Sequence, residues 1–137
     1  MKNAMIAVLL GLGLLGCEAP APVTPFKLDG RWAWDDTANC AAKGNWLVID
    51  GTFLSLVWRG RTLNTIAGLS WWVEEGEGGA RLSWRYVVKG RPYEERFAMI
   101  DEGRLVLEAS LVAGAPAPGA DRLIGRALVR CPADGEN

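Results

Sequence analysis

The sequence places two carboxylates side by side, Glu94 and Glu95, and a pair of carboxylates is what glycoside hydrolysis usually requires. Their neighbours alternate as in a strand, so the two side chains point to opposite faces and cannot flank one bond. The chain has no histidine, which removes the commonest general base and the commonest metal ligand. It also has no Gly-x-Ser-x-Gly elbow and no phosphate loop. The sequence therefore predicts a protein that is not an enzyme and needs no cofactor or metal.

Seven tryptophans suggest binding instead, because indole offers a broad apolar face with one polar handle. Strand alternation makes Glu95 the one charge on an apolar face, opposite Trp84 on one side and Ala109 on the other. A lone carboxylate there is costly, so it should be protonated, paired or wetted. It could be the polar handle of a pocket for a small cationic or hydroxylated guest. The alternatives are a rim position, a local bulge, or an interior that side chains fill. The predicted pocket residues are Trp71, Trp84, Tyr86, Tyr93, Glu95 and Leu107.

Three turns position these residues, because loops at 76–79, 89–90 and 101–103 all preserve one apolar face through four consecutive strands. A helical pattern would give no reason for three different turn lengths to agree. The predicted inward pairs are Leu69–Tyr86, Trp71–Trp84, Val73–Leu82, Tyr86–Tyr93, Leu82–Phe97, Phe97–Leu107 and Met99–Leu105. The predicted outward pairs are Ser70–Arg85, Glu74–Arg81, Arg85–Glu94 and Arg96–Glu108.

Turn signals continue at short intervals along the chain, with apolar runs of strand length between them. The fold class predicted is all-β, an antiparallel up-and-down meander of about eight or nine strands. Closure into a small barrel would best bury its single apolar face, and a β-sandwich is the alternative. The pattern breaks at Ala67–Gly68, which requires a longer turn or a bulge. A brief helix is expected at 38–43, with Asp36 or Thr37 as its N-cap. The predicted strands are 28–35, 45–50, 52–58, 61–66, 69–75, 80–88, 91–100, 104–112 and 121–131.

The N-terminus carries an export signal, in which Lys2 precedes an apolar run that is too short for a comfortable membrane span. The run ends in Leu14-Leu15-Gly16-Cys17, which resembles the lipobox of bacterial lipoproteins. That resemblance implies a signal peptide over residues 1–16 and a diacylated Cys17 at the mature N-terminus.

The rest of the chain divides simply. Three prolines predict an extended tether over residues 17–26. One β-barrel domain over 27–132 follows, and then a disordered tail over 133–137.

The lipoprotein resemblance also assigns the cysteines and the compartment. With Cys17 in the lipid anchor, Cys40 and Cys131 remain as a pair in an oxidising space, where a disulfide is expected and two separate thiols are the alternative. An aspartate after the lipidated cysteine commonly retains such proteins in the inner membrane. Glu18 stands here instead, which implies the periplasmic side of the outer membrane and leaves the inner membrane and cell surface open. Export and the formal charge of −1 argue against nucleic acid as a partner.

Gly30-Arg31-Trp32 opens the first predicted strand, and Arg130 lies in the last. This arrangement resembles the lipocalin and avidin type of small barrel, in which such a tryptophan closes one end and a late arginine packs on it. The resemblance implies that Trp32 and Arg130 are structural and that the barrel holds a small apolar ligand. Without it, Trp32 and Trp34 are ordinary core residues of a β domain.

Two functions follow from these observations. The first is a membrane-anchored, non-enzymatic domain that binds a small apolar ligand or supports an envelope assembly. The second is a protein-binding inhibitor of an envelope hydrolase, because bacterial lipocalin-like barrels include protease inhibitors.

Overall fold

The structure, a computed structural model, describes residues 26–133 of the chain. Strands dominate this range, which contains no α-helix and only two short 3-10 turns, so the predicted all-β class is confirmed. The elements are β1 (Gly30–Trp34), η1 (Thr37–Cys40), β2 (Trp46–Asp50), β3 (Phe53–Trp58), β4 (Arg61–Ala67), β5 (Ser70–Gly76), β6 (Gly79–Val88), β7 (Arg91–Asp101), β8 (Arg104–Val112), β9 (Ala115–Pro116), η2 (Ala120–Arg122) and β10 (Ala127–Arg130).

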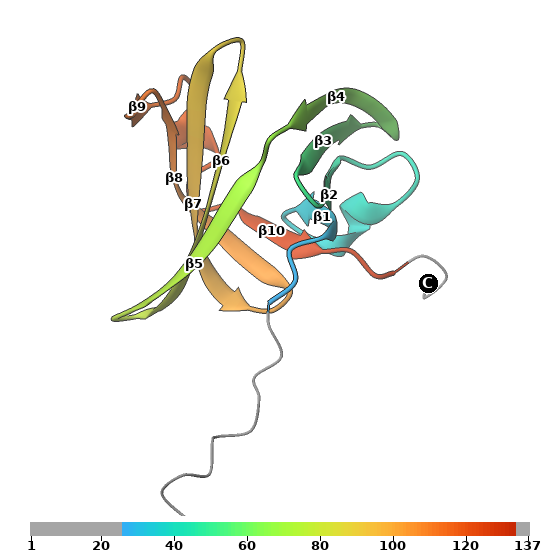
Figure 1. Ribbon diagram of the computed structural model, residues 1–137. Helices are drawn as coiled ribbons and strands as arrows, with labels where there is room; N and C mark the ends of the chain where they lie inside the picture. The colour runs from blue at the N-terminus through green and yellow to red at the C-terminus, as the bar shows by residue number, and fades with distance from the viewer. Residues whose placement is uncertain (1–25, 134–137) are drawn as a thin grey trace, which may run out of the picture.

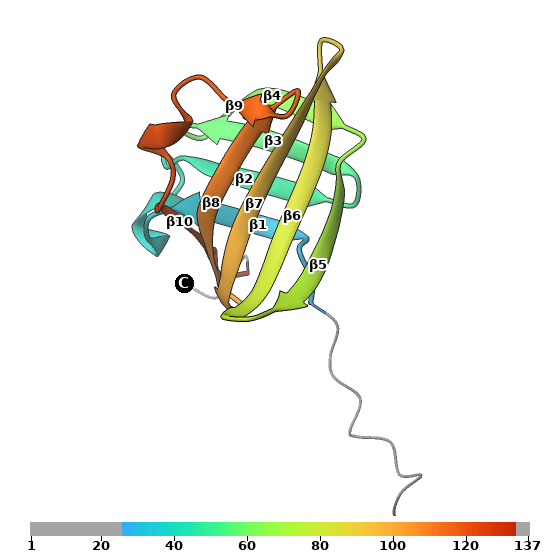
Figure 2. The same ribbon diagram turned by 90° about the vertical axis from the view of Figure 1, so that its left-hand side faces the viewer.

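The strands form one antiparallel sheet in the order β4-β3-β2-β1-β10-β8-β7-β6-β5, with β9 paired to β8. Most neighbours in the chain are neighbours in the sheet, but β4 and β5 form its two ends. β10 lies between β1 and β8 and so joins the end of the domain to its beginning. Figures 1 and 2 show the result as two layers, with β1–β4 on one side and β5–β8 crossing them on the other.

The predicted closure into a barrel is not met, because the path of hydrogen-bonded strands ends at β4 and β5 within the described range. These two strands follow one another in the chain, but Ala67–Gly68 does not turn them into a hairpin. The amide of Leu69 instead donates to the carbonyl oxygen of Thr52 at 2.8 Å, in the β2–β3 turn. The chain therefore passes from one layer to the other, and the alternative of a sandwich or open sheet fits better.

The core lies between the two layers and takes its side chains from the inward positions of every long strand. Trp32, Trp84 and Phe97 are its largest fully buried members. The remaining core residues are Leu28, Leu47, Ile49, Leu54, Ile66, Leu69, Leu82, Leu105, Leu107 and Leu128. Both layers contribute, so neither can fold without exposing its apolar face.

A second, smaller cluster covers the opposite face of β1 and β10. It contains Ala33, Ala127 and Val129 together with Cys40 and Cys131, whose sulfur atoms are joined at 2.01 Å. The disulfide is thus present between the expected partners. The helix expected at 38–43 is the 3-10 turn η1, in which the Asp36 side chain accepts from the Ala38 amide. The last strand is shorter than the predicted 121–131, because η2 occupies its beginning.

The register of β5, β6 and β7 is confirmed. Trp71 faces Trp84, and Val73 faces Leu82. The next hairpin places Tyr86 opposite Tyr93. The outward pairs Ser70–Arg85, Glu74–Arg81 and Arg85–Glu94 are likewise in register.

The register of β7 and β8 is right at one end and wrong at the other. Phe97 faces Leu107 as predicted, but a bulge follows, so Arg96 faces Ala109 rather than Glu108. The extra residue in β8 shifts every pair beyond it, and Glu95 therefore lies opposite Ser110 instead of Ala109. The sequence offers no turn signal for this bulge, which lies in the middle of the strand.

Candidate functional site

Glu95 projects from β7 onto the inner face of the sheet, where three side chains donate hydrogen bonds to its carboxylate. The indole Nε1 of Trp84 on β6 donates to Oε1 at 2.9 Å, and the hydroxyl of Tyr86 donates to the same oxygen at 3.2 Å. From β8, Ser110 Oγ donates to Oε2 at 3.3 Å. Glu95 thus faces inward as predicted and accepts three hydrogen bonds, one of them from a residue that the bulge brings opposite it.

All three donors to Glu95 are neutral, and none of the ion pairs in the described range involves this carboxylate. Its neighbour Glu94, on the outer face, is different, since Arg85 and Arg96 each approach it at 2.6 Å. The hydrogen bond from Arg85, with that from Arg96, holds the pKa of Glu94 below its usual value against the opposing effect of burial. Glu95 is thus a half-buried carboxylate without a cationic partner.

Tyr86 is the residue most affected by this arrangement. Burial raises the pKa of the Tyr86 hydroxyl strongly, and the negative charge of Glu95 raises it further. The hydroxyl therefore remains protonated and available as a donor. Its ring stacks on Tyr93, with centroids 5.4 Å apart and planes within 5° of parallel.

Aromatic rings form the floor of this cluster. Trp84 and Phe97 meet edge to face at 4.6 Å, and both are fully buried. Tyr86, Tyr93 and Glu95 are only partly buried. Solvent therefore reaches the cluster on the side of the two tyrosines, while the opposite side is closed by packing.

The predicted pocket residues do not all meet. Trp84, Tyr86, Tyr93 and Glu95 form one cluster, whereas Leu107 is buried opposite Phe97 in the core. Trp71 lies across from Trp84 but turns its ring toward Phe26, at 6.0 Å.

Two further residues were missed by sequence reasoning. Ser110 was missed because its inward position depends on the bulge. Phe26 was assigned to the tether, yet its ring packs 6.4 Å from that of Trp32. No pattern in its neighbourhood distinguishes it from tether residues.

The end of the inner face beyond Trp71 is closed by Arg130. Its guanidinium lies 4.3 Å from the centroid of the Trp32 ring and 5.8 Å from that of Phe26. It donates to the carbonyl oxygens of Lys27, Asp29 (3.0 Å) and Glu102 (3.5 Å). Burial lowers the pKa of Arg130, against the charge of Glu102. The contact between Trp32 and Arg130 is the one that the lipocalin resemblance implied.

Trp84, Tyr86 and Glu95 do not line the best-formed hollows on the surface of the described domain. One, of about 270 Å³, lies where β1, β3 and η1 end; its lining includes Trp34, Trp58 and Leu63. Leu63 is 67 % exposed. A bulge between β3 and β4 turns it out of the core.

The remaining expectations concern metals, membranes and the N-terminus. Residues 26–133 contain no group of three or more histidine, cysteine, aspartate or glutamate side chains that could hold a metal ion. No helix in the same range has the length and apolarity to cross a membrane. The proposed lipidation site, Cys17, lies outside the described residues.

No protein-family model, curated protein or solved structure matches this chain. Its function is therefore inferred from the side chains described above.

Proposed function

We propose that this chain is an exported lipoprotein whose single β domain binds a small ligand without catalysis. The ligand would have an apolar body and a cationic or hydroxylated head. The observation that carries the proposal is the half-buried carboxylate of Glu95, held by three neutral donors and lacking a cation. A carboxylate can accept about four hydrogen bonds. One acceptor position thus remains for a guest, and a cationic guest would supply the missing charge.

The aromatic side chains support the choice of ligand. The stacked rings of Tyr86 and Tyr93 offer a flat apolar surface beside the carboxylate. The π-faces of such rings attract cations. A guest would enter past these two partly buried rings, because Trp84 and Phe97 fill the space beneath them.

The proposed membrane localisation is supported by other residues, at the N-terminus of the chain. The apolar signal and Leu14-Leu15-Gly16-Cys17 support lipidation of Cys17, and Glu18 supports the periplasmic side of the outer membrane. The disulfide between Cys40 and Cys131 supports an oxidising compartment. Mass spectrometry of the mature N-terminus is expected to find a diacylglyceryl adduct on Cys17, and cleavage at another position would contradict the anchor.

Ligand binding can be tested with three amphiphiles that share one tail. A chain that begins at residue 17, with Cys17→Ser so that no lipid is attached, is titrated with decylamine, decanol and decanoate below their micellar concentrations. Tryptophan fluorescence is followed. Decylamine and decanol should bind more tightly than decanoate, whose head would be repelled by Glu95. Equal affinities, or tightest binding of decanoate, would contradict the proposal.

Glu95→Gln locates the site. Hydrogen bonds to a charged group contribute about 1.5–3 kcal/mol, so this variant should bind decylamine at least about tenfold more weakly. Glu77→Gln, which makes the same change of charge in the exposed β5–β6 turn, is the control and should bind like the wild type. Equal losses in both variants would indicate a general charge effect.

A further inference from the structure

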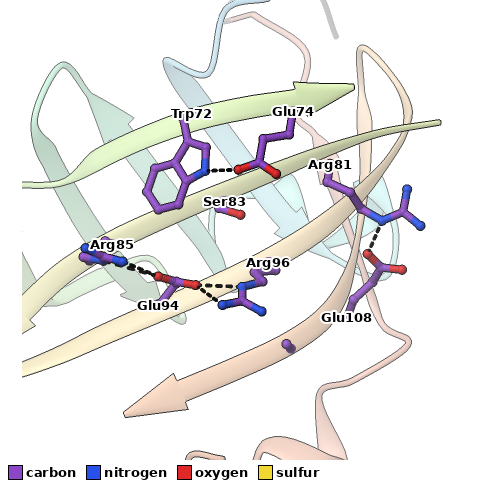
Figure 3. A pocket seen from close by; sticks show the side chains of 9 residues that line it. Trp72, Glu74, Arg81, Ser83, Arg85, Glu94, Arg96 and Glu108 are labelled. Atoms are coloured by element: carbon purple, nitrogen blue, oxygen red, sulfur yellow. Dashed lines mark hydrogen bonds and ion pairs between the residues drawn. The ribbon is translucent and has the colours of Figure 1, made fainter. Parts of the chain in front are cut away.

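A concave surface lies on the outer face of β5–β8, away from Glu95. This outer hollow has a volume of about 630 Å³. Figure 3 shows its residues: long side chains stand around the rim, and Ser83 lies between them. The lining is Trp72, Glu74, Arg81, Ser83, Arg85, Glu94, Arg96, Glu108 and Ala109.

The hollow is built by the alternation of large and small side chains across the strands. Ser83 on β6 is paired with Trp72 on β5 and with Arg96 on β7. Arg96 is paired in turn with Ala109 on β8. Two small residues therefore form the floor, and the register that orders the inner face also creates this depression.

Ser83 is the residue that points to a ligand. It is only 7 % exposed, and its hydroxyl makes no hydrogen bond with the residues that the structure describes. Its large neighbours shield it, and it is directed into the hollow (Figure 3). No buried side-chain nitrogen or oxygen atom of the described residues lacks a partner, so the Ser83 hydroxyl, which has none, is open to the hollow. A ligand in the hollow could therefore form a hydrogen bond with this hydroxyl in place of water.

The charges of the hollow are already balanced. Arg85 and Arg96 both contact Glu94, and Arg81 contacts Glu108 at 2.6 Å. Glu74 accepts a hydrogen bond from the Trp72 indole at 3.0 Å. Three arginines thus lie among three glutamates. A charged ligand would have to compete with these internal ion pairs, whereas hydroxyl groups can use the N–H donors and carboxylate oxygens that the pairs leave free.

We propose that the outer hollow binds a neutral carbohydrate. A sugar ring has an apolar C–H face and hydroxyls that both donate and accept. Trp72 would supply the apolar surface at the rim, the arginines and glutamates would contact ring hydroxyls, and Ser83 would be the polar contact of the floor. Volumes of about 300–1,000 Å³ are usual for small-molecule sites.

The test uses the full chain, uniformly labelled with ¹⁵N, in a detergent without a sugar headgroup. Maltotriose, cellotriose and chitotriose are the neutral probes, and citrate is the anionic one. The indole N–H signal of Trp72 is assigned by its absence in Trp72→Phe. At least one trisaccharide should shift this signal, while the signal of Trp58, which is 49 % exposed on β3, stays unchanged.

Substitutions then test the floor of the hollow. Ser83→Ala removes one hydrogen bond, so the trisaccharide affinity should fall about two- to tenfold. Ser70→Ala, at an exposed serine of β5, is the control and should bind like the wild type.

The proposal is overturned if none of the trisaccharides shifts the Trp72 signal, if citrate binds more tightly than all of them, or if Ser83→Ala binds the trisaccharide as tightly as the wild type does. A shift of Trp58 equal to that of Trp72 would also overturn it. None of these results bears on Glu95, so the two proposals can fail separately.

Discussion

Arg130 and Glu95 are both charged residues on the inner face of the sheet, and the protein surrounds them differently. The guanidinium of Arg130 donates to three backbone carbonyls and lies over the ring of Trp32. The carboxylate of Glu95 accepts only from side chains, those of Trp84, Tyr86 and Ser110. The orientation of a backbone carbonyl is fixed by the fold, whereas a hydroxyl group can rotate and donate its hydrogen bond to another partner.

This difference separates a residue that holds the fold together, Arg130, from one whose hydrogen-bond partners can be exchanged for a ligand, Glu95. Arg130 joins the last strand to the segment before β1 and to the β7–β8 turn, so its bonds connect three parts of the chain. The hydroxyl groups at Glu95 could instead be shared with a ligand at little cost to the fold. We therefore expect changes at the end of the domain that Arg130 closes to reduce stability, and changes at Glu95 to alter binding and titration.

Loss of the disulfide should lower the free energy of unfolding the most, since the Cys40–Cys131 bond holds the end of β10, the strand that carries Arg130. Cys40 and Cys131 are separated by 91 residues, and removal of a native disulfide typically costs about 2–5 kcal/mol. Urea unfolding of the Cys40→Ala, Cys131→Ala double variant should show a loss of this size. The reduced wild type should unfold at the same urea concentration as the variant. Identical midpoints for the oxidised and reduced wild type would mean that the bond contributes nothing to this end of the domain.

Arg130→Met should have the next largest effect, about 2–3 kcal/mol, because the carbonyls of Lys27, Asp29 and Glu102 lose their donor. Arg59→Met is a matched control. Arg59 also lies over a tryptophan, at 5.7 Å from the Trp58 ring, but both residues are exposed. Exposed cation–π pairs contribute about 0.5–1 kcal/mol. If the two variants lose equal stability, the contacts of Arg130 with the backbone are not what distinguishes it.

Much of the cluster around Glu95 could be predicted from sequence, because hairpin turns fix the register locally. The turn lengths at 76–79 and 89–90 were sufficient to place Trp71, Trp84, Tyr86 and Tyr93 on one face. Ser110 could not be placed, because the bulge beside Phe97 has no turn signal. Period-two alternation assumes an unbroken strand, and one extra residue reverses its prediction for everything beyond.

That the sheet stays open between β4 and β5 could not be predicted from local sequence patterns either. The direction of the chain after Gly68 depends on a hydrogen bond from Leu69 to Thr52, in a turn two strands earlier. Ser83 shows a third limit: a serine at an outward strand position reads as an ordinary solvent-facing residue. Its burial arises only from the large side chains that neighbouring strands place around it.

Glu95→Gln should have the smallest effect on stability, within about 0.5 kcal/mol at neutral pH, because the amide oxygen can still accept from Trp84 and the amide nitrogen can donate to Ser110.

The effect of Glu95→Gln on stability should instead emerge at alkaline pH. The folded-state pKa of Tyr86 is raised above its unfolded value of about 10. The folded state therefore holds this proton more tightly than the unfolded state does. The resulting stability is fully present below pH ~10 and is lost as the pH rises further. Removing the charge of Glu95 lowers the pKa of Tyr86, so the variant should lose less stability than the wild type above that pH. Urea unfolding at a series of alkaline pH values measures this difference. Absorbance of the phenolate in a Tyr93→Phe background, where Tyr86 is the only tyrosine left, reports its ionisation directly. Identical alkaline profiles with and without the carboxylate would show that Glu95 does not act on Tyr86 through its charge, and Glu95 would then resemble Arg130 as a purely structural residue.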